Sequence, residues 1–157
     1  MRARAGVNDA AMRTSKNRPA RAFRRVLVPI DFTRKNLRTV KIAGRVAEKG
    51  GTLTLLHVIE RIDEGDSRSL SAFYRKLEST AREKMKTLLT AAGPSATRSQ
   101  ILYGNRVEQI LRYAQEKKVD LIVMSSHRLS PGRPGENWGT ISYKVGILSR
   151  CPVLLVK

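Results

Sequence analysis

The residues best placed for chemistry lie in the segment from Met124 to Ser142, between an apolar strand and a helix. The loop returns into the start of this helix at Gly139-Thr140. The first N–H groups of a helix have no partner within it and lie at the positive end of its dipole, so they favour anions. Glycine lets a phosphate approach the backbone, and Arg128 adds a cation. The segment predicts an anion site; the alternative is an ordinary helix cap.

Asp31 is a second residue of interest, because it stands at the carboxyl end of the first predicted strand, Val26–Ile30. In an open α/β sheet, ligands bind outside the carboxyl ends of the strands. A carboxylate at this point can accept hydrogen bonds from a ligand, or it can cap the helix that follows. The sequence alone leaves these two interpretations equally weighted.

The remaining reactive side chains do not assemble into a catalytic or metal set. His57 lies inside an apolar strand, which is more typical of a satisfied core histidine, and His127 follows another strand. Two histidines lack the further ligands that a metal site needs. Neither histidine pairs with a nucleophile at a strand-to-helix turn, and Cys151 is expected to be structural. We therefore expect a protein that is not an enzyme and binds no metal of its own.

Strands and helices alternate along the chain, which predicts an α/β fold. The helical stretches are stopped at Gly50-Gly51 and at Gly93-Pro94. Alternating strands and helices pair in parallel through right-handed crossovers. We expect a doubly wound, five-stranded, mostly parallel sheet with helices on both faces. The expected strands are Val26–Ile30, Thr52–Ile59, Thr97–Tyr103, Asp120–Met124 and Pro152–Val156.

The charge is strongly positive, with 31 Lys and Arg against 13 Asp and Glu, or +18. Residues 1–22 combine small, polar and basic residues without an apolar period, so we expect a disordered basic arm before a domain at 23–157. The arm predicts weak, nonspecific contact with polyanions, although a solvated basic surface is the simpler explanation of the charge. A single cysteine and the lack of a long apolar run predict a cytoplasmic protein without a membrane segment.

Five short segments, in the same order and with suitable spacing, resemble the universal stress protein family over about residues 24–157. The resemblance implies a Rossmann-like fold of the adenine nucleotide alpha hydrolase type, and a homodimer joined through the last strand. The matching segments are Val26–Phe32, Leu55–Val58, Gly104 ahead of Val107–Ile110, Asp120–His127 and Cys151–Val156.

Many members of this family bind ATP through a pattern G-x-x-G, nine residues, then G-[ST]. Here Ser125 and Arg128 stand at the two leading glycines, ten residues separate Arg128 from Gly139, and Pro131 and Pro134 remove two N–H donors. Arg128 either blocks the approach of phosphate to the backbone or replaces the missing contacts.

The resemblance implies a stress-response protein that binds ATP or AMP through a degenerate phosphate loop, with no metal beyond a nucleotide-bound Mg²⁺. The alternative is a dimeric regulatory protein that acts through protein partners without a nucleotide. The residues implied for the adenine and ribose are Pro29, Ile30, Asp31 and Val58, and those implied for the ribose and phosphates are Met124, Ser125, Arg128, Gly139, Thr140 and Ile141.

Overall fold

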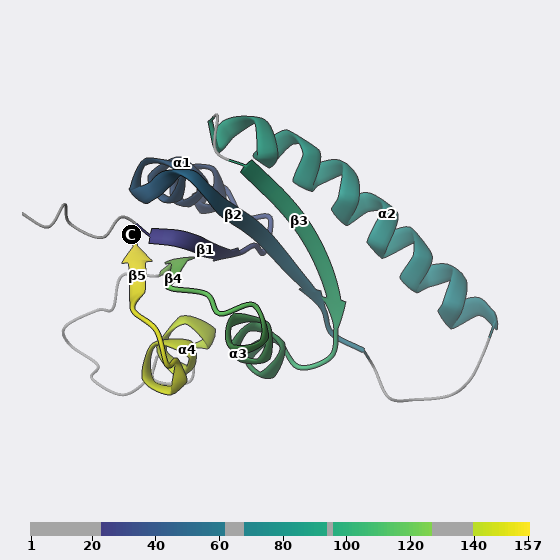
Figure 1. Cartoon of the computed structure of the whole chain (residues 1–157). Helices are drawn as coiled ribbons and strands as arrows, with labels where there is room; N and C mark the ends of the chain where they lie inside the picture. Colours follow the sequence, from purple (N-terminus) through teal and green to yellow (C-terminus); the bar gives the residue numbers. More distant parts are fainter. Residues whose placement is uncertain (1–22, 62–67, 94–95, 127–139) are drawn as a thin grey trace, which may run out of the picture.

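Five parallel strands form one sheet in the order β3-β2-β1-β4-β5 (Figure 1). The computed structural model describes residues 23–61, 68–93, 96–126 and 140–157, so the predicted arm at 1–22 lies outside the described residues. All the strand pairings are parallel, which confirms the predicted sheet. The strands are β1 (Phe23–Pro29), β2 (Ala47–Ile59), β3 (Ala96–Tyr103), β4 (Leu121–Ser125) and β5 (Val153–Val156).

Helices cover both faces of the sheet, α1 and α2 on one side and α3 and α4 on the other (Figure 1). Successive side chains of a strand point to opposite faces. Val26 and Val28 therefore join the core beneath α1 and α2, while Leu27 joins the core on the other face. The helices are α1 (Lys35–Val46), α2 (Arg68–Ala91), α3 (Arg106–Glu116) and α4 (Ile141–Leu148). Among the described residues, no helix is long and apolar enough to cross a membrane.

The end of α1 differs from the prediction, which placed it at Gly50-Gly51. The helix ends at Val46, and both glycines lie inside β2. The pairing of β1 with β2 is irregular between Phe23 and Arg25, opposite this part of β2. Gly50 has a φ of +80°, a left-handed conformation that glycine adopts without steric cost. The glycines therefore shape an irregular strand rather than terminate a helix.

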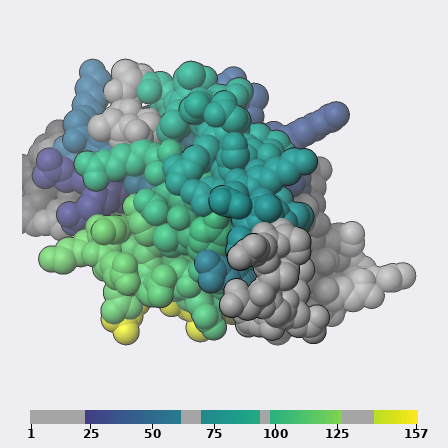
Figure 2. Space-filling model, turned by 90° about the vertical axis from the view of Figure 1, so that its right-hand side faces the viewer, coloured from purple at the N-terminus to yellow at the C-terminus, as the bar shows by residue number. Residues whose placement is uncertain are grey.

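The long helix α2 packs on the sheet mainly through its C-terminal half. Ala81 and Met85 are buried, whereas Phe73 and Leu77 in the first half are exposed. Figure 2 shows the teal residues of α2 spread across the side of the molecule next to β3. The end of α2 meets α1 closely: a Cβ on Gly44 would lie 2.1 Å from the carbonyl oxygen of Ala92. Glycine at position 44 is what permits this contact.

The winding of the sheet reverses at β1, which pairs with β2 on one side and with β4 on the other. At the amino ends of β1 and β4, the carboxylate of Asp120 accepts hydrogen bonds of 2.9 Å from the backbone N–H groups of Arg24 and Arg25. The next helix after β1 is α1 on one face of the sheet, and the next helix after β4 is α4 on the other face (Figure 1). This reversal opens a crevice at the carboxyl ends of the strands, where ligands of open α/β sheets bind.

Candidate functional site

A pocket of about 470 Å³ lies at the carboxyl ends of β1, β2 and β4, against the starts of α1, α3 and α4. Its walls combine apolar side chains with polar groups from several elements, as is usual for small-molecule sites. The lining residues are Pro29, Ile30, Asp31, Asn36, Leu56, His57, Val58, Arg106, Ile110, Met124, Ser125, Thr140, Ile141 and Ser142.

Eight of the ten residues that the sequence singled out lie together in this lining: Pro29, Ile30, Asp31, Val58, Met124, Ser125, Thr140 and Ile141. The other two, Arg128 and Gly139, lie outside the described residues. The fold therefore brings these eight residues into one lining, although they come from segments that are far apart in the sequence.

Asp31 is held in a turn that connects β1 to α1. Its Oδ1 accepts hydrogen bonds from the backbone N–H of Thr33 at 3.0 Å and from the Thr33 hydroxyl at 2.8 Å. The helix itself begins after Arg34, which makes no side-chain cap. Asp31 thus shapes the turn, and its carboxylate still lines the pocket. Burial alone would raise the pKa of Asp31, but the hydrogen bonds from Thr33, with those involving Asn36 and the Asp31 backbone, together lower the pKa. The side chain is therefore ionised near neutral pH.

A buried polar network, which the sequence reasoning missed, joins α1 to the end of β4. The amide nitrogen of Asn36 donates to the hydroxyl of Ser125 at 3.0 Å, and its Oδ1 accepts from the backbone N–H of Asp31 at 3.1 Å. The Thr39 hydroxyl lies 2.9 Å from the same Ser125 oxygen. Asn36 and Thr39 are almost fully buried. Polar residues at the inward positions of α1 were the available signal for this network.

His57 was predicted to be a satisfied core residue, and this is only half correct. Its Nδ1 lies 2.8 Å from the carbonyl oxygen of Ile30, so Nδ1 carries the hydrogen and donates it. Its ring packs on Phe32, with 4.5 Å between the ring centroids. The side chain is nevertheless part of the pocket wall. Burial, together with the nearby Arg106 and Lys84, lowers the pKa of His57 against the opposing effects of Ile30 and Asp31.

Arg106 is the one Lys or Arg side chain among the described residues that line the pocket. Its Nη2 lies 3.1 Å from Oε2 of Glu60, so an ion pair joins the start of α3 to the end of β2. Arg106 and His57 also border a second hollow of about 270 Å³, which reaches Leu77 and Lys84 on α2. The sequence offered one signal for Arg106, its place directly after the third strand.

Thr140 begins α4 at the edge of the pocket. Its hydroxyl oxygen accepts from the backbone N–H of Tyr143 at 3.4 Å, so this residue is the helix cap that the sequence allowed. The start of α4 therefore brings its positive dipole end to the pocket, next to the hydroxyl of Ser142. Within the described residues, no group of three or more His, Cys, Asp or Glu side chains is placed to hold a metal ion.

The arrangement defines an α/β protein with a polar-lined crevice at the reversal of its parallel sheet. The model of the universal stress protein family matches residues 22–157. The chain is 30% identical over 148 residues to universal stress protein YxiE of Bacillus subtilis strain 168, covering 86% of this chain and 99% of the relative. A universal stress protein of Thermus aquaticus is also 30% identical, with the same coverage of each chain. The chain belongs to the universal stress protein family.

Solved structures of the family share the fold. A universal stress protein in complex with cAMP superposes with a TM-score of 0.64 at 22% identity, covering 87% of this chain and 98% of that one. A universal stress protein from Archaeoglobus fulgidus in complex with dAMP gives a TM-score of 0.63 at 14% identity, covering 87% and 99%. These likenesses confirm the predicted adenine nucleotide alpha hydrolase-like fold.

Proposed function

We propose that this chain binds an adenine nucleotide, AMP or ATP, in the pocket at the carboxyl ends of β1, β2 and β4, without catalysing a reaction on it. The observation that carries the proposal is the convergence of Asp31, Val58, Met124 and Thr140 on one pocket lining. Two family members of the same fold were solved in complex with cAMP and with dAMP.

The chemistry of the lining suits the parts of such a ligand. Apolar side chains, including Ile30, Val58 and Met124, offer a dry surface for the base. The ionised carboxylate of Asp31 is an acceptor for the ribose hydroxyls, since two carboxylate oxygens offer about four lone-pair sites. The start of α4 at Thr140 favours the phosphate. An Mg²⁺ ion would come with the polyphosphate of ATP, because the described residues offer it no ligand cluster.

Calorimetry with AMP and ATP on the wild type, Asp31→Asn and Asp120→Asn tests the proposal. Asp120 is a matched control because its carboxylate also accepts hydrogen bonds from N–H groups, but at the opposite ends of the strands. A hydrogen bond to a charged group contributes about 1.5–3 kcal/mol, so Asp31→Asn should weaken binding about tenfold or more. Asp120→Asn should leave the affinity almost unchanged.

A wild type that binds neither nucleotide, and carries none when the purified protein is analysed by mass spectrometry, would contradict the proposal. Equal losses in both variants would mean that Asp31 acts only on the fold. Hydrolysis of ATP that is lost with Asp31 would contradict the non-catalytic part of the proposal.

We further propose that the chain forms a homodimer through β5. We also propose that it is a cytoplasmic protein that acts in the stress response of the cell. The outer strand β5 and helix α4 carry exposed apolar side chains, with Leu154 at 38%, Leu155 at 41% and Ile147 at 62% exposure. An exposed edge strand pairs readily with a second copy, and a two-fold axis covers both edges. The same surface supports the second candidate function, a dimeric interaction protein that needs no nucleotide.

Light scattering over a range of concentrations tests the dimer. We expect a dimer at micromolar concentration and a monomer for Leu154→Lys/Leu155→Lys, since charges on an edge strand oppose pairing. A wild type that stays monomeric when concentrated would exclude this assembly.

A further inference from the structure

Four cations form a row along one side of α1: Arg34, Arg38, Lys41 and Arg45. We call this set the basic row. The spacing of four, three and four residues keeps side chains on one line of a helix. All four residues are exposed. At 1.5 Å per residue, the row extends over about 16 Å.

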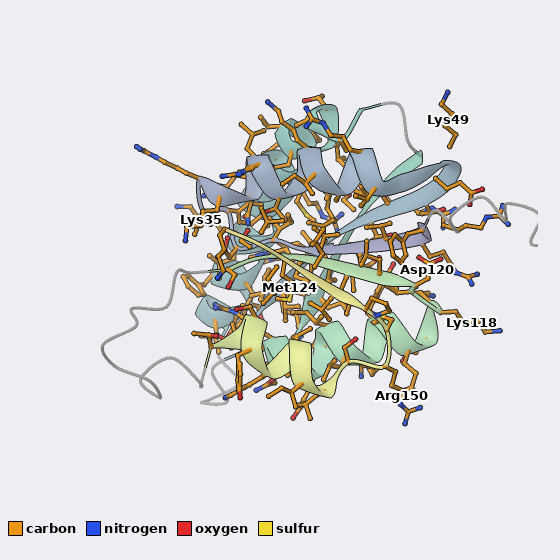
Figure 3. All side chains as sticks on the ribbon, turned by 90° about the vertical axis from the view of Figure 1, so that its left-hand side faces the viewer. Lys35, Lys49, Lys118, Asp120, Met124 and Arg150 are labelled. Atoms are coloured by element: carbon orange, nitrogen blue, oxygen red, sulfur yellow. The ribbon has the colours of Figure 1, made fainter. Side chains whose placement is uncertain are left out.

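The basic row points directly away from the sheet. The residues of α1 that are buried against the core are Asn36, Thr39, Val40 and Ala43, on the opposite side of the helix. Figure 3 shows α1 lying along the outside of the molecule, with Lys35 near one end and Lys49 beyond the other. Within the described part of the chain, none of the four side chains makes an ion pair or hydrogen bond.

Among the described residues, no acidic side chain forms an ion pair with the basic row. No acidic residue occurs between Asp31 and Glu48. Glu48, which follows the helix, already pairs with Arg24 at 3.3 Å. The other amphipathic helices differ: α2 sets Glu78 against Arg82 and Glu83 against Lys86, whereas α1 has no such pair. The row is thus a local concentration of positive charge beyond the general excess of the chain.

This placement of charge is unfavourable for the helix itself. Like charges three or four residues apart repel each other, typically by about 0.2–0.5 kcal/mol per pair. Arg34 at the start of the helix also opposes the helix dipole, whereas Arg45 in the last turn is favourable to it. Moreover, Arg34 occupies the cap position without capping the helix. Repulsion among the four cations is thus a cost to the helix that only Arg45 offsets. Charge retained at such a cost is consistent with a surface that binds an anionic partner.

We propose that the basic row binds the phosphate backbone of a nucleic acid, independently of its sequence. A strand of duplex presents one phosphate for about every 3.4 Å of axis, so a cationic row of about 16 Å faces several of them. Contacts from Lys and Arg to phosphate oxygens carry no sequence information, so we expect little preference for any base sequence.

Other anionic partners fit this surface less well. A membrane-bound helix needs a free apolar face, but the apolar face of α1 is buried in the core. A protein interface usually has an apolar centre. On the described surface of α1, Leu37 is the single large apolar side chain that is exposed, which is too little to form such a centre. The phosphate backbone of a nucleic acid needs no apolar contact.

The test compares two full-length variants that lose the same charge. One replaces the basic row (Arg34→Gln, Arg38→Gln, Lys41→Gln and Arg45→Gln). The other replaces four exposed cations elsewhere (Arg75→Gln, Lys76→Gln, Arg98→Gln and Lys117→Gln). Glutamine keeps the helix propensity of Lys and Arg almost unchanged. Binding of a 20-base-pair duplex is measured by fluorescence anisotropy between about 50 and 200 mM salt.

We expect the basic-row variant to bind the duplex at least tenfold more weakly than the wild type at the lowest salt. The slope of log K against log salt should fall by about 3 to 4, since each neutralised phosphate contributes about 0.9. The second variant should lose much less. Thermal unfolding gives an independent check of folding: the basic-row variant should be at least as stable as the wild type, because repulsion is removed.

Equal losses in the two variants would overturn the proposal and assign binding to total charge. No duplex binding by the wild type would also overturn it. The same would follow if the wild type bound anionic vesicles or polyglutamate through the basic row in preference to the duplex.

Discussion

The side-chain amide of Asn36 lies 3.0 Å from the hydroxyl oxygen of Ser125, across 89 positions of sequence. This bond joins the first turn of α1 to the carboxyl end of β4. The family resemblance places Ser125 where the nucleotide-binding pattern has a glycine. Its hydroxyl is engaged by Asn36 and by Thr39 on the α1 side, so the extra side chain has partners within the fold.

We predict that Asn36→Ala weakens AMP binding about tenfold, because the Ser125 hydroxyl then keeps only its contact with Thr39 and is held less firmly away from the pocket. In a Ser125→Gly background, where no hydroxyl remains, the same change should cost about threefold or less. Calorimetry on the four proteins of this cycle measures the coupling. An identical loss in both backgrounds would show that Asn36 acts only through the backbone N–H of Asp31.

A second prediction concerns Arg128, where the family pattern has its other leading glycine. We expect Arg128→Ala to leave ATP binding unchanged or to improve it, because the long side chain competes with the phosphate for approach to the backbone. Arg128→Ala combined with Ser125→Gly should bind more tightly still. A tenfold loss in the single variant would instead identify Arg128 as a phosphate ligand, through charge-assisted hydrogen bonds.

The prediction from sequence succeeded where the signal was local and repeated. Apolar runs such as Leu121–Met124 located the strands, and their alternation with helices required a parallel sheet. It failed at Gly50-Gly51, because a glycine pair that ends a helix and one that distorts a strand look alike in the sequence.

The site was predicted less completely than the fold. Asp31 was expected at the site because it follows a strand, where a parallel sheet binds its ligands. Met124 was expected there through the family resemblance. Asn36 and His57 were not, since their roles depend on partners 89 and 27 positions away. Asn36 was the inward polar residue of an amphipathic helix, and such contacts become visible only once β1 and β4 are known to be neighbours.

His57 should make stability depend on pH. Burial, with help from Arg106 and Lys84, lowers its pKa in the folded chain below the ordinary 6.5. As the pH falls below about 6.5, the unfolded chain binds the proton first, so stability is lost toward the lower, folded-state pKa. In His57→Asn the amide can still donate to Ile30, but it does not titrate. Urea unfolding from about pH 7.5 to about pH 5.5 should show a smaller loss of stability for this variant. Equal losses would contradict the prediction.

Gly44 and Gly146 form a matched pair for a packing test. A Cβ at Gly44 would overlap the Ala92 carbonyl, so Gly44→Ala should destabilise the protein by about 1–3 kcal/mol despite the better helix propensity of alanine. A Cβ at Gly146 in α4 would meet nothing within 4 Å. Gly146→Ala should therefore stabilise the chain by up to about 1 kcal/mol. Denaturant unfolding measures both; a neutral Gly44→Ala would mean that α2 shifts freely on α1.

The pairing of β1 with β4 also has a kinetic consequence. Asp120 joins β4 to β1 at one end. At the other end, Asn36 of α1 bonds both Ser125 of β4 and the backbone N–H of Asp31, so the contacts at both ends close loops of about 90 residues. In Figure 3, Asp120 and Met124 mark the two ends of β4 along this seam. Contacts between such distant residues form slowly, because closing a long loop loses conformational entropy before the contact contributes favourable free energy. A ligand that contacts both strands would therefore bind only after this seam has formed. It would lower the unfolding rate much more than it raises the folding rate, and so would prolong the lifetime of the folded domain.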